Sequence, residues 1–196
     1  MHAHQHLQNA DPILGAVIER LGPLEERPPD ENHFAALCRI VVGQQLSTTV
    51  ARAIWSRVLE KFDGPPTPAR VLSATTEELR APGLSGAKAR TLQALAAHVL
   101  DGKLDTAHLE TLSDAEIARE ITAVKGLGPW SADIFLMFHL NRPDVLPVGD
   151  LGTREAARQL YDLDERPDAA KLTEIAEKWR PHRTLASRYL WRFLDG

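Results

Sequence analysis

The chain has 196 residues, of which 43% are hydrophobic and 26% are charged, and its formal net charge is −4 at pH 7. This apolar fraction is ordinary for a globular protein and suffices for a full core, while the length allows one domain or two small ones. The negative net charge argues against a protein that coats nucleic acid without specificity, although a local basic surface is compatible with it.

Two absences bear on location and redox environment. No apolar run approaches about 18 residues, and the N-terminus lacks the charged and apolar regions of a signal peptide, so we expect a cytoplasmic protein without a membrane partner. Cys38 is the only cysteine, which excludes an internal disulfide and a cysteine-ligated metal cluster. It lies in the apolar run 34–42, where we expect a core residue.

The N-terminal stretch is polar and carries alternating histidines at His2, His4 and His6. Alternating histidines also occur in metal-binding tracts. Because polar chain ends are usually poorly ordered, we interpret this stretch as a flexible terminus.

Apolar residues at helical spacing dominate the rest of the chain, and no segment alternates convincingly with a period of two. The pattern predicts an all-α protein of about ten helices. In chain order the expected helices span residues 13–21, 34–42, 47–59, 69–72, 75–80, 87–100, 113–124, 129–140, 151–161, 168–179 and 183–194. The proline-rich segment 63–68 predicts a loop, and Thr75 with Glu78 fits a capping box.

The most informative segment is 124–133, which reads V-K-G-L-G-P-W-S-A-D. We expect a helix to end at Val124, a tight turn at 126–128, and a second helix to begin at Pro129. The first turn of that helix offers N–H groups at the positive end of the helix dipole, and together these bind a phosphate. A carboxylate, Asp150, follows about one helix length downstream.

Five segments carry a resemblance to a known family. They are I-V-V-G-Q-Q-L-S at 40–47, G-L-S at 83–85 with K-A-R at 88–90, the segment 124–133, D-V-L-P-V-G-D-L-G at 144–152, and W-R-P-H-R at 179–183 with Y-L-W at 189–191. Together they resemble the helix-hairpin-helix, Gly/Pro-Asp (HhH-GPD) superfamily of DNA glycosylases, and within it the 3-methyladenine DNA glycosylase II branch. The resemblance covers residues 30–194.

The resemblance implies a helix-hairpin-helix glycosylase fold, in which two helical subdomains flank a cleft within a single domain of residues 1–196. One subdomain would contain the N-terminal helix and the C-terminal helices, and the other would span approximately residues 45–140. Larger members of the family carry an N-terminal β domain, for which this chain has no room.

Asp150 stands directly before a predicted helix, where a capping carboxylate contributes about 1 kcal/mol. By resemblance it is also the catalytic aspartate, and the two roles are compatible because N–H donors and the helix dipole favour the ionised carboxylate. Cleavage of the N-glycosidic bond builds positive charge on the deoxyribose in an oxocarbenium-like transition state. Asp150 would stabilise that charge, activate water, or do both.

Trp130 separates two reaction types within the resembled family. Relatives that also cut the DNA backbone carry a lysine at this place, which attacks the sugar and forms a Schiff base. Tryptophan is no nucleophile, and Lys125 lies on the other side of the turn. The resemblance therefore implies a monofunctional enzyme without lyase activity. If the resemblance is set aside, Trp130 fits an ordinary buried aromatic residue.

The base pocket implied by the resemblance comprises Trp130, Ile134, Leu151 and Trp191, although Trp191 fits the core equally well. A purine methylated at N3 or N7 is positively charged, and a cation over an indole face is favoured by up to about 2 kcal/mol. The charge also makes the base a better leaving group. Family members often carry aromatics where Ile134 and Leu151 stand, so the sequence leaves the lesion spectrum open.

The resemblance implies three further sets of residues, two that contact DNA and one that holds a cation. The hairpin that would grip phosphates comprises Lys125, Gly126, Leu127 and Gly128. The wedge that would fill the gap left by an extruded nucleotide comprises Gln45 and Leu46, although a glutamine here also fits an exposed cap, and Leu46 the core beneath the turn. No cofactor is expected to be required, but family members often hold a structural Na⁺ or K⁺ on hairpin carbonyls, which match Thr122, Val124 and Gly126.

Charged residues outside these sets have more than one interpretation. Lys88 and Arg90 follow an earlier Gly-containing turn and fit either phosphate contacts or a solvated helix face. Arg183 is expected to pair with Asp144 or Asp162. The sequence contains no group of His, Cys and carboxylate residues at metal-site spacing.

The leading hypothesis is a monofunctional, monomeric DNA glycosylase of base excision repair. It would flip alkylated bases, chiefly N3- and N7-methylpurines, out of double-stranded DNA and hydrolyse the N-glycosidic bond with help from Asp150. The alternative is a non-catalytic helix-hairpin-helix module that recognises bent or damaged duplex. A third hypothesis, a helical scaffold for protein partners, has only the net charge in its favour.

Overall fold

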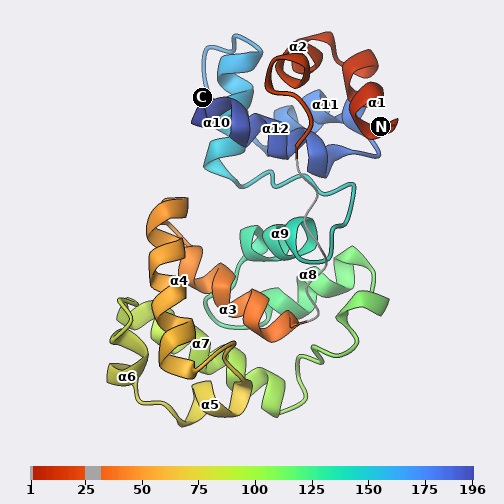
Figure 1. The fold of residues 1–196 in the computed structure, drawn as a ribbon. Coiled ribbons are helices and arrows are strands. Elements are labelled where there is room, and N and C mark those ends of the chain that lie inside the picture. Colours follow the sequence, from red (N-terminus) through yellow and green to blue (C-terminus); the bar gives the residue numbers. More distant parts are fainter. Residues whose placement is uncertain (1, 25–31) are drawn as a thin grey trace. The chain divides into compact units, whose positions relative to one another are not determined.

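The structure is a computed structural model that describes residues 2–24 and 32–196 of the chain. Within these ranges it consists of α-helices and short 3₁₀ helices, and no strand occurs there (Figure 1). The all-α prediction is therefore confirmed. No helix in the described part of the chain combines the length and the apolar character that crossing a membrane requires.

The chain divides into two compact units. The terminal unit combines residues 1–28 with residues 136–196, and the central unit comprises residues 29–135. Helix α3 (His33–Gly43) belongs to the central unit although it precedes position 45. Helix α9 (Pro129–Phe138) begins in the central unit and ends in the terminal unit.

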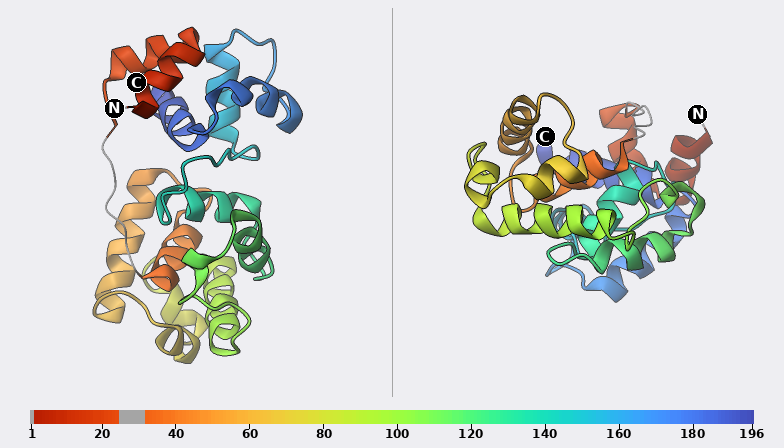
Figure 2. Two further views of the ribbon diagram at one scale, coloured as in Figure 1. Left: turned by 90° about the vertical axis from the view of Figure 1, so that its right-hand side faces the viewer. Right: turned by 90° about the horizontal axis from the view of Figure 1, so that it is seen from below.

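The helices of the terminal unit pack around one apolar cluster. They are α1 (His2–Ala10), α2 (Pro12–Leu21), α10 (Leu151–Leu160), α11 (Ala169–Ala176), η2 (Glu177–Trp179) and α12 (Arg183–Asp195). Leu7, Leu14 and Tyr189 are completely buried in this cluster. Helix α10 packs against α12 (Figure 2). This pairing brings α10, which begins directly after Asp150, next to α12, which carries Trp191.

The prediction of a flexible N-terminus is wrong. Residues 2–10 form helix α1, and the side chain of Leu7 is fully buried. The ring of His4 meets that of Tyr189 edge-on with 5.7 Å between centroids, and His6 meets His182 at 5.2 Å. The polar tract folds because a buried leucine and these ring contacts attach it to the core. Among the residues that the structure describes, no three His, Cys, Asp or Glu side chains are grouped to hold a metal ion.

Asp11 connects the first two helices to the C-terminal part of the terminal unit. Its buried carboxylate accepts hydrogen bonds from backbone N–H groups at the start of α2, from the Tyr161 hydroxyl, and from Trp179 Nε1 at 2.8 Å. Lys178 forms an ion pair with it at 3.2 Å. Burial alone would raise the pKa of Asp11, but the hydrogen bonds from Trp179 and Tyr161 lower it below its usual value of 3.8. A charged Asp11 therefore stabilises the terminal unit.

The central unit is a second helical bundle. Besides α3 and the first part of α9 it contains α4 (Thr48–Phe62), α5 (Pro68–Ser73), α6 (Thr76–Arg80), α7 (Gly86–Leu100), η1 (Leu109–Thr111) and α8 (Asp114–Thr122). Cys38 is fully buried as predicted, and burial raises the pKa of its thiol. The capping box of Thr75 and Glu78 is present. Helix η1 was not predicted, because three residues are too few to show a period.

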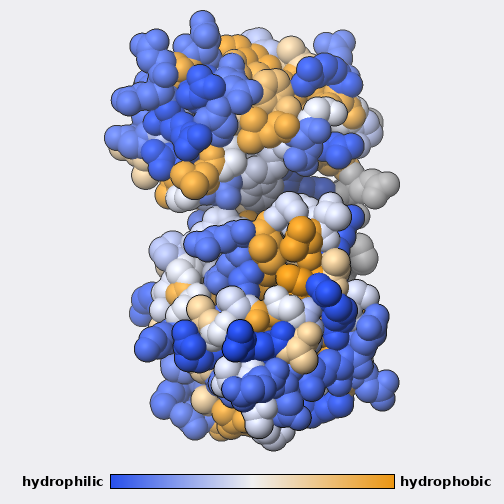
Figure 3. Space-filling view, turned by 90° about the vertical axis from the view of Figure 1, so that its left-hand side faces the viewer, coloured by the Kyte–Doolittle hydropathy of each residue, from blue (hydrophilic) through white to orange (hydrophobic). Residues whose placement is uncertain are grey.

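The exposed apolar side chains are scattered over both units. On the face drawn in Figure 3, hydrophilic residues dominate and apolar residues gather in separate patches. In the described ranges the large exposed apolar residues are Ile13, Leu46, Val50, Leu72, Leu100 and Leu151. Single exposed apolar residues are ordinary, but Leu46 and Leu151 are also members of the predicted wedge and pocket.

Candidate functional site

Asp150 caps helix α10. Its Oδ1 accepts hydrogen bonds from the Thr153 backbone N at 2.7 Å and from the Thr153 hydroxyl at 3.0 Å. A third donor, Trp191 Nε1 on α12, lies at 2.7 Å from the same oxygen. The capping role predicted for Asp150 is thus confirmed, and three donors on one oxygen fix the plane of the carboxylate.

Trp191 contacts both the carboxylate and an aromatic neighbour. Its indole stacks on Phe138, the last residue of α9, with 5.4 Å between ring centroids and 22° between ring planes. Phe138 therefore covers one face of the indole while the indole N–H points to Asp150. Sequence reasoning placed Trp191 in the pocket or the core, but it did not identify the bond to Asp150 or the contact with Phe138.

Gly152 makes the approach of Trp191 to Asp150 possible. A Cβ atom at this position would lie 3.1 Å from Asp150 Oδ1 and 3.3 Å from Trp191 Cδ1. Such contacts are tight, so any larger residue would push the indole or the carboxylate aside. Glycine weakens a helix, so a glycine in the first turn of α10 is a sequence signal that could have identified this close approach.

The other predicted pocket residues lie in two places. Leu151 follows Asp150 in the terminal unit, and 62% of its surface is exposed. Trp130 and Ile134 lie one turn apart on the part of α9 that belongs to the central unit, and both are half-buried. The terminal unit thus brings together Asp150, Leu151 and Trp191, and the central unit brings together Trp130 and Ile134.

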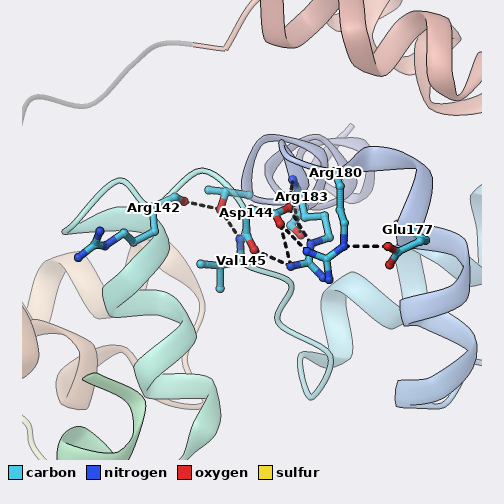
Figure 4. Close-up of polar contacts among 8 residues, drawn as sticks. Arg142, Asp144, Val145, Glu177, Arg180 and Arg183 are labelled. Atoms are coloured by element: carbon cyan, nitrogen blue, oxygen red, sulfur yellow. Dashed lines mark hydrogen bonds and ion pairs between the residues drawn. The ribbon is translucent and has the colours of Figure 1, made fainter. Parts of the chain in front are cut away.

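The loop that leads to Asp150 is held by an arginine cluster (Figure 4). Arg183 Nε donates to Asp144 Oδ1 and Arg180 Nη1 donates to Asp144 Oδ2, each at 2.7 Å. Burial alone would raise the pKa of Asp144, but the hydrogen bonds and charge of Arg183 hold it below its usual range. Of the two partners expected for Arg183, Asp144 is the one with which it pairs in the structure. The cluster attaches the loop before α10 to the start of α12.

The hydroxyl of Thr184 also attaches this loop to α12. The backbone N of Val145 donates to Thr184 Oγ1 at 3.0 Å, and the same hydroxyl donates to the Arg142 carbonyl at 2.6 Å. Thr184 is buried at the start of α12. The segment that ends in Asp150 is therefore anchored to the helix that carries Trp191 at several points.

The predicted hairpin joins α8 to α9 in the central unit. Helix α8 ends at Thr122, and Gly126 in the turn has φ 97°. A Cβ on Gly126 would lie 2.1 Å from Thr91 Oγ1 on α7, a distance that no side chain tolerates. Gly126 is therefore required both by its backbone conformation and by its contact with α7. The side chain of Lys125 is exposed, whereas that of Leu127 is buried and anchors the turn.

The turn that contains the predicted wedge lies between α3 and α4. Gln45 has a left-handed backbone with φ 56°, and Leu46 is 38% exposed. Ser47 caps α4 through a bond to the Val50 N–H. We call residues 44–47 the wedge turn. Its two predicted wedge residues are exposed, which excludes the alternative of Leu46 as a core residue.

Two charged or polar side chains hold the end of α3 where the wedge turn begins. Lys88 Nζ on α7 donates to the Val42 carbonyl at 2.8 Å, and burial lowers the pKa of this lysine. Gln44 Nε2 donates to the Gly126 carbonyl at 3.1 Å and lies 3.2 Å from Ser131 Oγ. Lys88 is half-buried and holds the end of α3, so it does not lie on a fully solvated face, and its predicted contact with phosphate stays a prediction. The side chain of Arg90 is exposed.

Comparison with known proteins places this geometry in a family. The model of the HhH-GPD superfamily base excision DNA repair proteins matches residues 38–182. DNA-3-methyladenine glycosylase 1 of Schizosaccharomyces pombe is 32% identical over 199 residues, which cover 97% of this chain and 86% of that protein.

Solved structures agree with the family match. The Schizosaccharomyces pombe 3-methyladenine DNA glycosylase in complex with abasic DNA has a TM-score of 0.91 and 31% identity, and the match covers 98% of this chain and 96% of that one. DNA-3-methyladenine glycosidase from Bacillus halodurans has a TM-score of 0.80 and 34% identity over 98% of this chain and 88% of that one. The chain therefore belongs to the HhH-GPD superfamily of base excision DNA repair proteins.

Proposed function

We propose that the protein is a monofunctional, monomeric DNA glycosylase that excises alkylated bases, chiefly N3- and N7-methylpurines, from double-stranded DNA. The observation that carries this proposal is the position of Asp150, a helix-capping carboxylate held by Trp191 at 2.7 Å in a chain of the base excision family. The similarity to 3-methyladenine DNA glycosylases supports an alkylated base as the substrate.

Asp150 would act on the sugar rather than on the base. As the N-glycosidic bond breaks, positive charge develops on the deoxyribose, and a carboxylate beside it lowers the energy of that transition state. The same carboxylate would orient the water that attacks the sugar. A methylated purine leaves as a neutral base, so the reaction needs no strong general acid.

Trp130 supports a single activity. In the resembled family the position is a lysine in enzymes that also cleave the backbone, and the amine attacks the sugar to form a Schiff base. Trp130 cannot do this chemistry, and Lys125 is exposed on the other side of the turn. The product would therefore be an intact strand with an abasic site.

Aromatic side chains would recognise the cationic base. An indole face attracts a methylated purine by up to about 2 kcal/mol when water is excluded. Phe138 covers one face of Trp191, so a base would use the opposite face. In the central unit, Trp130 and Ile134 lie one turn apart on α9 and would present an aromatic and an aliphatic surface to the base. In the terminal unit, Leu151 is exposed beside Asp150.

The hairpin and the wedge turn would hold the DNA around the lesion. The start of α9 offers backbone N–H groups and a positive helix end to a phosphate, and Lys125 adds a charge. Gln45 and Leu46 are exposed in the wedge turn and would fill the gap that the flipped nucleotide leaves. The insertion would offset part of the energy lost in unstacking and would bend the duplex.

A structural Na⁺ or K⁺ would be held by the hairpin carbonyls of Thr122, Val124 and Gly126. Carbonyl oxygens are suitable ligands for such ions. The Val124 carbonyl accepts a bond from Leu127 N at 3.0 Å and the Gly126 carbonyl accepts one from Gln44 at 3.1 Å, so each retains a second lone pair. A bound cation would supply positive charge close to the phosphate.

Replacing Asp150 by Asn tests the proposal. The amide keeps an oxygen for Thr153 and Trp191, so the cap survives, but the negative charge is lost. We expect base release from N-methylated duplex DNA to fall by at least about a hundredfold while binding to DNA with an abasic-site analogue is retained. Released bases are identified by mass on a panel that includes 3-methyladenine, 7-methylguanine, hypoxanthine and ethenoadenine.

Asp168 provides a matched control for this variant. It caps α11 through a bond of 2.8 Å to the Lys171 N–H, as Asp150 caps α10. The Asp168→Asn variant should keep wild-type base release. Full activity of Asp150→Asn would refute the catalytic assignment, and a wild-type protein that binds damaged duplex but releases no base from the panel would instead indicate the non-catalytic module.

A further inference from the structure

Gln44 connects two parts of the central unit that are 82 residues apart in sequence. It is the first residue of the wedge turn and directly follows the last residue of α3, Gly43. Its side chain reaches the hairpin, where Nε2 donates to the Gly126 carbonyl at 3.1 Å and lies 3.2 Å from the Ser131 hydroxyl on α9. One amide group therefore bridges the wedge turn, the hairpin turn and the first part of α9.

The surroundings of this bridge leave the hairpin little room to shift. Gly126 lies against Thr91, whose Oγ1 would be 2.1 Å from an added Cβ, and Thr91 is buried on α7. Lys88, one turn before Thr91 on α7, holds the Val42 carbonyl at 2.8 Å. Helix α7 thus supports both the end of α3 and the hairpin, and Gln44 closes the connection directly between them.

We infer that Gln44 is a positioning residue that sets the wedge turn at a defined distance from the phosphate-binding hairpin. This inference rests on the proposed function. A wedge that enters the base stack must do so at a fixed offset from the phosphate that the hairpin holds, because the two contact the same stretch of duplex. Gln45 and Leu46 are exposed, so they have few contacts of their own to keep that offset.

The inference predicts a specific defect. The Gln44→Met variant keeps the length of the side chain but removes both bonds to the hairpin and α9. It should bind a duplex containing an abasic-site analogue about tenfold more weakly than the wild type. Its affinity for undamaged duplex should change by less than about threefold, because the hairpin still binds phosphate without the wedge.

Gln93 gives a matched control. Its Nε2 donates to the Ala74 carbonyl at 3.0 Å, a bond of the same kind that lies elsewhere in the central unit. The Gln93→Met variant should bind both duplexes as the wild type does. Melting temperatures of both variants are measured in parallel, and equal melting of the Gln44→Met variant and this control shows that a binding loss is not general unfolding.

A double-mutant cycle separates a positioning role from a general one. In a background of Gln45→Ala with Leu46→Ala, where there is no wedge to position, adding Gln44→Met should cause no further loss of affinity for the abasic duplex. Losses that add independently, or a Gln44→Met variant with wild-type affinity, would overturn the inference. The binding assay needs no base release, so a catalytically inactive wild type would refute the proposed function without deciding the role of Gln44.

Discussion

The indole Nε1 of Trp191 donates a hydrogen bond of 2.7 Å to Oδ1 of Asp150 across 41 positions of sequence. The bond gives Trp191 a second role beside its aromatic surface, because it orients the carboxylate that we propose for catalysis. Its stacking on Phe138 in turn fixes the indole. The carboxylate is therefore held by the cap of its own helix and by a rigid aromatic pair.

The Trp191→Phe variant separates these two roles. Phenylalanine keeps an aromatic face against Phe138 but removes the N–H donor to Asp150. A hydrogen bond to a charged group contributes about 1.5–3 kcal/mol, so we expect kcat to fall about tenfold or more, with a smaller change in KM. Steady-state base release from methylated duplex DNA measures both constants.

Trp179→Phe is the matched control for this change. Trp179 Nε1 donates to Asp11 at 2.8 Å, which is the same type of bond in the core of the terminal unit. The control variant should lower the melting temperature with kcat preserved in the fraction that remains folded. If Trp191→Phe lowers the melting temperature as much as Trp179→Phe and leaves kcat intact, Trp191 is a core residue only.

Gly152→Ala should impair activity more than stability. The added methyl group would lie 3.1 Å from Asp150 Oδ1 and 3.3 Å from Trp191 Cδ1, so the bond between these two residues would be displaced. Alanine also favours a helix by up to about 1 kcal/mol relative to glycine, which offsets part of the strain. We expect base release to fall about tenfold with little change in melting temperature.

A neighbouring glycine controls for the substitution itself. A Cβ on Gly149 would meet no atom within 4 Å, so Gly149→Ala should retain activity. Equal activity of the Gly152→Ala and Gly149→Ala variants would show that the packing at Gly152 does not matter for the reaction.

Gly126→Ala should destabilise the central unit. The substitution combines the cost of a positive φ of 97° with a Cβ that would lie 2.1 Å from Thr91 Oγ1. A left-handed conformation costs about 1–2 kcal/mol, and overpacking adds about 1–3 kcal/mol. We therefore expect urea denaturation to show a loss of about 2–5 kcal/mol, together with weaker binding to DNA.

Gly64→Ala isolates the backbone part of this cost. Gly64 has φ 114°, but an added Cβ there would meet no atom within 4 Å. Its variant should lose only the conformational part, about 1–2 kcal/mol. The difference between the two variants measures the contact of Gly126 with Thr91, and a difference of zero would contradict that contact.

The ionisation of Asp11 should make the free energy of unfolding depend on pH. Hydrogen bonds from Trp179 and Tyr161 hold the pKa of Asp11 in the folded chain below its usual value of 3.8, despite burial. The stabilisation is therefore complete above about pH 5 and is lost as the pH falls through the lower, folded pKa. The free energy of unfolding, measured from pH 7 to pH 2, should decline less steeply in Asp11→Asn than in the wild type.

The Asp11→Asn variant should also be less stable than the wild type at pH 7, because its amide forms no ion pair with Lys178. Asp168→Asn is again the matched control, since Asp168 caps a helix without such buried partners. A wild-type acid response that persists unchanged in Asp11→Asn would show that other carboxylates cause it.

Local patterns in the sequence determined most of the helices. Ser47, Thr75 and Ser113 cap α4, α6 and α8 by bonding N–H groups three residues away, and such contacts depend only on neighbouring residues. The hairpin turn and the capping position of Asp150 are local in the same sense. Local patterns did not predict helix α1, because it is polar and its order depends on burying Leu7 against helices from the other end of the chain.

The tertiary structure decided which of these local features act together. The bond from Trp191 to Asp150 and the bridge from Gln44 to Gly126 join residues that are 41 and 82 positions apart. Nothing in either local sequence specifies the partner, because the pairing depends on how whole helices pack. The sequence alone determined which groups stand at helix ends, whereas packing determined which distant side chain each of them meets.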